Sequence, residues 1–427
     1  MKHNFRLLIG ALAIAIPMSI NAQVKPVKPE GPRKDEGKPK MERPEGPRKD
    51  EGKPKMEKPQ QPGRPEKPAK PEKPEKKDPK GGMEMPKISG FVQGMYQANI
   101  NDEGELTSNT FRMRRVRLSV DGNLYKGLSY KLQGDFSRSP MLVDAFLKYK
   151  VCDAFAIQFG QFKTPFTLES PINPVNLEIF DYGEVVQKLG GYSDVCGVGG
   201  LGRDIGLMAT GKLFPIKGEE GNVKYHVVDY AVGVFNGNGP TTTDNNNRKD
   251  LVGRLEVHPG LKALTLSGSY YYGMYKSSSD AANIATGEAN LGHGARNRWA
   301  AGAQYNDGKF LVRGEYVSGE TGMQAGTIDE FGTTITEDRF LYSNGYYGVI
   351  GYNFGLGKDK KQTLMPVFRY EHFAKDVDIT NGGTNWYTVG INYWPLKSVN
   401  FKLDYSLIQA ESGNNSHRIV GILSYKF

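Results

Sequence analysis

The last nine residues constrain the fold of this chain more than any other segment. They read Ile419-Val-Gly-Ile-Leu-Ser-Tyr-Lys-Phe427, with apolar or aromatic side chains at most odd positions and with Ser424 and Lys426 at even ones. Successive side chains of a β-strand point to opposite faces. The segment therefore predicts a strand with one continuous apolar face, which ends at an aromatic carboxyl terminus.

The other end of the chain predicts export. Lys2 and Arg6 precede an apolar run over residues 7–16, and small residues follow up to Ala22. This is the pattern of a secretory signal peptide, which we assign to residues 1–22. The apolar run is shorter than the roughly 20 residues of a membrane-spanning helix. No later segment is a continuous apolar run of that length, which leaves a soluble protein or a β-barrel.

Residues 23–87 have the composition of a disordered arm rich in Pro, Lys and Glu. They hold 15 of the 25 prolines and no aromatic residue, and a unit that begins at Pro29 recurs at Pro44. Such a segment buries too little apolar surface to offset the entropy of ordering it. We expect a solvated spacer in the periplasm. A second interpretation is a tether that contacts anionic cell-wall polymer.

The net charge of +9 belongs to the leader and the arm. The leader contributes +2 and the arm +7, whereas residues 88–427 hold 34 Lys and Arg against 34 Asp and Glu. The basic excess therefore does not indicate a nucleic-acid partner.

From residue 88 onward, alternating segments recur to the end of the chain, and this region holds all the aromatic residues that follow the leader. We predict sixteen strands, at 88–99, 110–121, 128–137, 141–150, 154–161, 204–213, 223–234, 250–257, 264–275, 297–306, 310–318, 341–353, 363–372, 386–394, 399–408 and 416–427.

The connections between these strands sort by length. Most odd-numbered connections, such as 162–203, are long, and most even-numbered ones, such as 395–398, are short. The tight connection at 138–140 departs from the pattern. Outer-membrane barrels have short turns at one end and long loops at the other, and the aromatic carboxyl terminus resembles their sorting signal. We therefore predict an all-β domain over 88–427, a 16-stranded antiparallel transmembrane β-barrel in outer-membrane lipid.

The strand faces predict a lumen that holds water, since sixteen strands enclose a wide channel. In 128–137, Leu132 and Phe136 point outward, while Lys131 and Asp135 point inward. Opposite charges two residues apart recur at inward positions: Arg254 with Glu256, Arg313 with Glu315, Arg369 with Glu371 and Lys402 with Asp404. These pairs predict salt bridges along the wall, or a transverse field that orients permeating solutes; the two are compatible.

The longest connection, 162–203, is predicted to fold into the barrel and narrow it, because an ordered loop of this length is usually functional. It is net acidic, with three basic residues against Glu169, Glu178, Asp181, Glu184 and Asp194. Because side chains alternate along a strand, Arg115 and Arg117 are predicted to point into the lumen. Arg112 and Arg114 are predicted to point away from it unless a bulge intervenes. Our candidates for a basic constriction are Arg115, Arg117, Lys163, Lys188 and Arg203. An alternative partner for Arg203 is Asp204.

Three ordered motifs carry a family resemblance. They are Phe159-Gly-Gln-Phe-Lys-Thr-Pro-Phe166 with Leu168-Glu169, Arg114-Arg-Val-Arg-Leu-Ser-Val-Asp-Gly-Asn-Leu124, and Arg203-Asp-Ile-Gly-Leu-Met-Ala-Thr-Gly-Lys-Leu213. Together they resemble the phosphate-selective porin O/P family over about 88–427. The resemblance implies a trimeric sixteen-stranded porin, and a basic constriction that selects anions, phosphate among them, in characterised members.

Enzymatic chemistry has no support in the sequence. No Gly-x-Ser-x-Gly, His-Glu-x-x-His or Cys-x-x-Cys motif occurs, and the six histidines are scattered. We expect no catalytic residue, no metal site and no cofactor. Cys152 and Cys196 fall in connections at opposite ends of the predicted barrel, so we expect unpaired thiols.

Two functions fit these observations. The first is a passive diffusion channel for small hydrophilic solutes; its neutral barrel and acidic loop leave open whether anions are preferred. The second is a structural barrel closed by its own loop, whose arm links the outer membrane to the cell wall.

Overall fold

The computed structural model describes residues 85–198, 200–276, 293–323 and 337–427. The expected signal peptide and all but the last residues of the arm lie outside this part of the chain. The limits and roles assigned to them therefore stay predictions. No helix within the described residues is long and apolar enough to cross a membrane.

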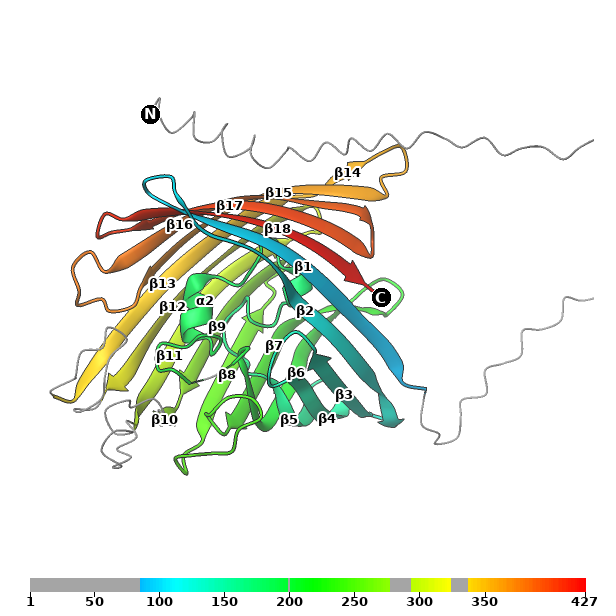
Figure 1. Ribbon diagram of the computed structural model, residues 1–427. Coiled ribbons are helices and arrows are strands. Elements are labelled where there is room, and N and C mark those ends of the chain that lie inside the picture. Colours follow the sequence, from blue (N-terminus) through cyan, green and yellow to red (C-terminus); the bar gives the residue numbers. More distant parts are fainter. Residues whose placement is uncertain (1–84, 199, 277–292, 324–336) are drawn as a thin grey trace, which may run out of the picture. The chain divides into compact units, whose positions relative to one another are not determined.

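One antiparallel sheet contains all the described strands (Figure 1). The strands are β1 (Lys87–Asn101), β2 (Leu106–Tyr125), β3 (Leu128–Asp135), β4 (Leu142–Cys152), β5 (Phe155–Lys163), β6 (Arg203–Lys217), β7 (Val223–Phe235), β8 (Asp250–Val257), β9 (Leu264–Tyr272), β10 (Met274–Lys276), β11 (His293–Asn306), β12 (Phe310–Met323), β13 (Arg339–Tyr352), β14 (Phe354–Leu356), β15 (Gln362–Ala374), β16 (Gly383–Leu396), β17 (Val399–Ala410) and β18 (Asn415–Lys426). Two helical segments, η1 (Pro174–Asn176) and α2 (Glu184–Leu189), lie in one connection.

These segments form sixteen strands, as predicted. β9 and β10 are halves of one strand, because both pair with β11, and β13 and β14 both pair with β15. All sixteen predicted strands are confirmed, and most are longer than expected. The first connection shrinks to 102–105 because β1 and β2 extend toward each other.

The sheet closes on itself, because β1 pairs with both β2 and β18. The carboxyl terminus takes part in this closure. Gly90 N donates to Phe427 O at 3.0 Å, and Phe427 N donates to Gly90 O at 3.1 Å. The aromatic terminal strand therefore seals the barrel to its last residue, and no open sheet edge is left at this seam for another chain to pair with.

Alternation separates the two faces as expected. Leu132 and Phe136 are more than half exposed on the outside, while Gln133 and Asp135 are buried on the inside. The same holds in the last strand, where Leu423 is exposed and Ser424 is buried. An apolar exterior and a polar interior are what a lipid-embedded barrel requires.

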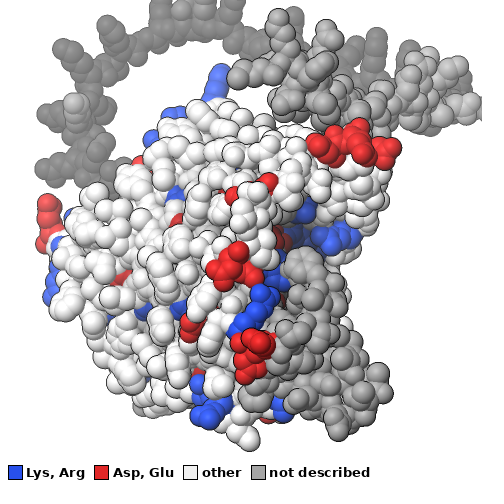
Figure 2. Space-filling model, turned by 90° about the vertical axis from the view of Figure 1, so that its left-hand side faces the viewer, with Lys and Arg blue, Asp and Glu red and all other residues white. Residues whose placement is uncertain are grey.

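The barrel has a turn end and a loop end. We call the end that carries the short connections 126–127, 153–154, 307–309 and 397–398, together with Phe427, the turn end. The loop end, on the left in Figure 1, carries the 164–202 connection. Figure 2 views this side, and basic and acidic side chains lie close together on its described part.

A β-bulge in β2 changes which arginines reach the lumen. The register with β1 pairs Gln93 with Arg115 but Gly94 with Met113, so Arg114 is the extra residue. A bulge of this kind shifts the parity of the strand. Arg112 and Arg114 therefore lie on the inner face with Arg115 and Arg117. The prediction that a bulge would turn Arg112 and Arg114 toward the lumen is confirmed.

The 164–202 connection folds into the barrel, and α2 lies among the strands in Figure 1. We call it the inner loop. Its Phe166, Leu177 and Val186 belong to the same buried cluster as Val317 of β12 and Tyr347 of β13. The main apolar core therefore lies inside the barrel, between the inner loop and the wall, and it holds the loop against one side of the lumen.

Candidate functional site

Buried salt bridges fix the inner loop to the β12–β15 side of the wall. Glu169 accepts from Arg313 at 3.4 Å and from Arg369 at 3.0 Å, and Glu178 accepts from Arg313 at 2.7 Å. Arg313 and Arg369 are at most 1% exposed. A buried guanidinium needs a carboxylate partner because its desolvation is otherwise uncompensated. The acidic residues of the loop supply these partners.

The start of α2 is attached to the same network. Gly183 N donates to Glu169 Oε2 at 2.7 Å, and Glu184 N donates to Glu371 Oε2 at 2.6 Å. A Cβ at position 183 would collide with the Arg369 guanidinium. Glycine is therefore required here so that the backbone can approach the wall arginine.

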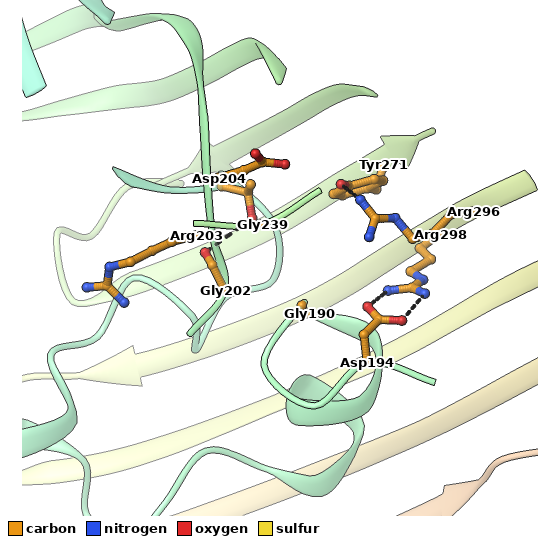
Figure 3. Close-up of a pocket in the computed structure, with 11 residues that line it drawn as sticks. Gly190, Asp194, Gly202, Arg203, Asp204, Gly239, Tyr271, Arg296 and Arg298 are labelled. Carbon is orange, nitrogen blue, oxygen red and sulfur yellow. Dashed lines mark hydrogen bonds and ion pairs between the residues drawn. The ribbon is translucent and has the colours of Figure 1, made fainter. Parts of the chain in front are cut away.

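A second attachment lies further along the inner loop. Arg298 of β11 forms a two-bond ion pair with Asp194, and Arg296 lies beside Tyr271 (Figure 3). Arg296 also pairs with Asp250 of β8. Burial by itself would raise the pKa of Asp194, but the Arg298 charge and its hydrogen bonds bring that pKa below the usual value. The Asp194 carboxylate is therefore held ionised in the barrel interior.

The two cysteines are both free, as expected. Cys152 is exposed at the turn end, and Cys196 is buried in the inner loop. Burial raises the pKa of the Cys196 thiol to about 11. This thiol is therefore protonated and unreactive while the loop stays attached.

A hollow borders the inner loop on the side of strands β2–β6. This hollow has a volume of about 250 Å³ and lies between the loop and strands β2–β6. We call it the basic hollow, because four cationic side chains and one carboxylate line it: Arg117, Lys131, Lys163, Arg203 and Asp144. Gln133, Gln158 and Asn173 add neutral hydrogen-bonding groups.

Three of the four cationic side chains of the basic hollow form ion pairs with carboxylates of the barrel wall. Arg117 pairs with Asp135 at 2.9 Å, and Arg203 and Lys131 share Asp144 at 2.7 Å and 3.3 Å. Figure 3 shows Arg203 pointing away from the Arg296 and Arg298 group.

Lys163 is held by the inner loop instead of by a carboxylate. It donates to the carbonyls of Ser170 and Ile172 and to the Tyr182 hydroxyl. Asp135, which pairs with Arg117 without lining the hollow, is the second carboxylate on this side, so four basic side chains stand against two carboxylates.

Two further arginines extend this basic side toward the loop end. Arg114 and Arg115 contact Asp181 of the inner loop at 2.5 Å and 3.3 Å. Burial opposes ionisation of Asp181, but the two arginines bring its pKa below the usual value. Arg138, in the 136–141 connection, has no carboxylate within 4.0 Å among the described residues.

The structure brings together three of the five predicted constriction residues, Arg117, Lys163 and Arg203. Arg115 lies beside them at Asp181. Lys188 does not line the hollow; it lies 3.8 Å from Glu184 within α2. The alternative pairing of Arg203 with Asp204 is wrong, because Arg203 pairs with Asp144.

Two of the four predicted wall pairs form: Arg254 with Glu256 at 3.3 Å and Arg369 with Glu371 at 2.9 Å. The other two do not form within 4.0 Å among the described residues, because the inner loop provides other partners. Arg313 pairs with Glu169 and Glu178, and Glu315 accepts from Leu168 N. Lys402 donates to the Leu177 carbonyl instead of to Asp404.

Sequence reasoning missed Asp144, the carboxylate that positions Arg203 and Lys131. Its parity in the predicted strand 141–150 places it on the inner face, opposite exposed Leu147. A count of every inward charge, rather than of charges in i, i+2 pairs, would have found it.

Comparisons with known proteins agree with this architecture. Among solved structures, an anion-selective porin from Comamonas acidovorans is 12% identical, with a TM-score of 0.55 over 80% of this chain and 99% of that one. The outer-membrane channel DcaP of Acinetobacter baumannii is 15% identical, with a TM-score of 0.53 over 82% and 98%. Salmonella typhi OmpF is 13% identical, with a TM-score of 0.51 over 80% and 97%.

These structural likenesses establish a shared barrel fold. No curated protein sequence matches the chain. The family model of the phosphate-selective porins O and P matches residues 87–420, which is most of the sequence and nearly the whole barrel. The chain therefore belongs to the phosphate-selective porin O and P family.

Proposed function

We propose that this outer-membrane diffusion channel prefers small anions and that the basic hollow is its selective passage. The observation that carries the proposal is the lining of the hollow: Arg117, Lys131, Lys163 and Arg203 face it, and Asp144 is the only carboxylate among its lining residues. Selectivity in channels arises where charged side chains meet the solute at close range. Family membership and fold indicate a channel rather than an enzyme.

The position of the basic hollow supports a solute path on this side. Phe166, Leu177 and Val186 of the inner loop pack into the core together with Val317 and Tyr347 of the opposite wall. We therefore place the solute path between the inner loop and β2–β6, where the hollow lies. Arg114 and Arg115 lie on the same side, so an anion meets positive charge before it reaches the hollow.

The hollow favours anions through its field instead of through a tight binding site. Arg117, Lys131 and Arg203 each have a carboxylate partner, and Lys163 is saturated by loop oxygens. A dehydrated phosphate needs several convergent donors that are free to bind it. The arrangement supports a graded preference for anions over cations, with phosphate admitted as one of them.

A planar bilayer with a potassium chloride gradient tests the proposal. We expect the reversal potential to have the sign of the chloride equilibrium potential. Lys131→Gln should lower the anion-to-cation permeability ratio roughly six-fold, because a charge about 8 Å from the solute in water shifts the energies of an anion and of a cation by about 0.5 kcal/mol each, in opposite directions. Lys150→Gln removes the same charge from an exposed pair with Asp153 and should leave the ratio unchanged. A reversal potential with the sign of the potassium equilibrium potential would contradict the proposal.

We also propose that the turn end faces the periplasm with the arm, and that three copies assemble. The turn end carries the amino-terminal end of β1 and the carboxyl terminus, and short turns face the periplasm in bacterial barrels. One structural neighbour, OmpT of Vibrio cholerae, is a trimer; it is 11% identical with a TM-score of 0.50. Light scattering of the detergent-solubilised protein should give a trimer mass, and a monomer mass would contradict the assembly.

A further inference from the structure

Two carboxylates face each other across the inner wall near the turn end. Asp229 of β7 is registered with Glu256 of β8, and His258 follows two residues after Glu256. One ligand atom from each of these residues lies within 4.8 Å of the other two. All three side chains are partly buried. This cluster lies outside the basic hollow, and the channel function does not use it.

The pairing is unfavourable unless a cation neutralises it, because like charges directly opposite on a sheet repel each other. Lys212 approaches Asp229 Oδ2 at 2.7 Å, and Arg254 approaches Glu256 at 3.3 Å. Asp229 Oδ1 is buried and has no hydrogen-bond partner among the described residues. One carboxylate oxygen is thus withdrawn from water without compensation, which is costly for a charged group.

The imidazole of His258 is oriented as a ligand. Its Nδ1 lies 3.2 Å from the Leu264 carbonyl, which can only accept, and 3.2 Å from the Thr265 hydroxyl, which can donate or accept. The tautomer that donates from Nδ1 to the carbonyl leaves the lone pair on Nε2, which lies 4.0 Å from Asp229 Oδ2. A histidine that donates one ring N–H to a backbone carbonyl and directs the other nitrogen at a carboxylate has the arrangement of metal-binding histidines.

We propose that Asp229, Glu256 and His258 bind a divalent transition metal, with Zn²⁺ as the best match. Zinc binds imidazole nitrogens and carboxylate oxygens, and a site with three protein ligands keeps a water molecule in the fourth position. Ligands at about 2.1 Å from a tetrahedral ion lie about 3.4 Å apart. The cluster must therefore contract by about 1 Å, and the largely exposed Lys212 must release Asp229.

Zinc titration of the full mature chain in detergent micelles, followed by calorimetry, tests this site. We expect one Zn²⁺ per chain, with affinity reduced at least ten-fold in His258→Gln and in Asp229→Asn. His372→Gln is the matched control, because His372 lies 3.8 Å from a single carboxylate, Glu411. This control should bind zinc as the parent does.

Lys212→Gln separates a metal site from a structural ion-pair network. Lys212 competes with the metal for Asp229, so its removal should tighten zinc binding, whereas a purely structural cluster would show no change. The proposal is overturned if the parent chain binds no zinc at micromolar concentrations, or if His258→Gln binds it as tightly as the parent. The proposal is also overturned if His372→Gln loses as much zinc affinity as His258→Gln. Should His258→Gln fail to fold, Asp229→Asn and Lys212→Gln still give effects of opposite sign.

Discussion

The two sides of the lumen use the same residue types for opposite purposes. On the β12–β15 side, Arg313 and Arg369 are buried and bound to Glu169 of the inner loop. On the β2–β6 side, Arg117 and Arg203 are also buried, but they are bound to wall carboxylates and line a hollow. The first set attaches the loop, and the second set creates the field that a solute meets.

This difference shows that the position of a carboxylate decides what an arginine does in a barrel wall. At Arg313 and Arg369 the partner comes from the loop, and the ion pairs hold the loop against that side of the wall. Where the partner lies beside the arginine on the wall, the lumen in front stays free, and some positive field remains. The acidic character of the inner loop is therefore compatible with an anion-preferring channel, because its Glu169 and Glu178 are used on the closed side.

The largest expected effect comes from breaking the attachment. Glu169→Gln should destabilise the loop–wall contact by about 3 kcal/mol, because it removes one partner of two buried arginines. The detached loop should then enlarge the single-channel conductance. Thiol labelling gives a second measurement: Cys196 should change from protected to reactive, with exposed Cys152 as the internal reference.

Unchanged conductance together with a protected Cys196 would show that apolar packing alone holds the inner loop. In that case the salt bridges on the closed side would be a consequence of burial, and the contrast between the two sides would lose its basis.

A smaller effect is expected on the open side. Asp144→Asn removes the one carboxylate that lines the basic hollow. The anion-to-cation permeability ratio should rise roughly six-fold, opposite in sign to Lys131→Gln, because one charge at about 8 Å in water shifts the energies of an anion and of a cation by about 0.5 kcal/mol each, in opposite directions. Reversal potentials measure this change. Asp153→Asn, at the exposed turn-end pair with Lys150, is the matched control, and a change of equal size there would remove the hollow from the selectivity mechanism.

Much of the fold could be predicted because barrel strands alternate with period two. All sixteen strands followed from alternation, and so did the inward positions of Arg115 and Arg117. Parity failed at Arg114, because a bulge between Gln93 and Gly94 shifts the register and has no clear sequence signal.

Less of the site could be predicted, because partner choice depends on contacts between distant residues. The i, i+2 spacing suggested that Arg313 pairs with Glu315, yet Glu169 and Glu178 bind Arg313 from the loop. Spacing along one strand cannot reveal a loop that crosses the lumen. The local pairing was correct at Arg254 and Glu256, and at Arg369 the local pair with Glu371 forms beside the ion pair with Glu169.

The smallest effect should come from Glu184, a loop carboxylate whose one ion-pair partner among the described residues is Lys188, at 3.8 Å. Burial raises the pKa of Glu184 above its usual value of 4.5. Its negative charge is therefore less favourable in the folded state than in the unfolded one. At pH 7, Glu184→Gln should leave stability unchanged or raise it by less than about 1 kcal/mol.

The difference between Glu184→Gln and the parent should vanish below about pH 4, where both side chains are neutral. Urea titrations at pH 7 and pH 4 measure it, with Cys196 labelling to show that the inner loop stays attached. A loss of stability at pH 7 as large as that of Glu169→Gln would contradict the division of the loop carboxylates into those that hold the wall and those that do not.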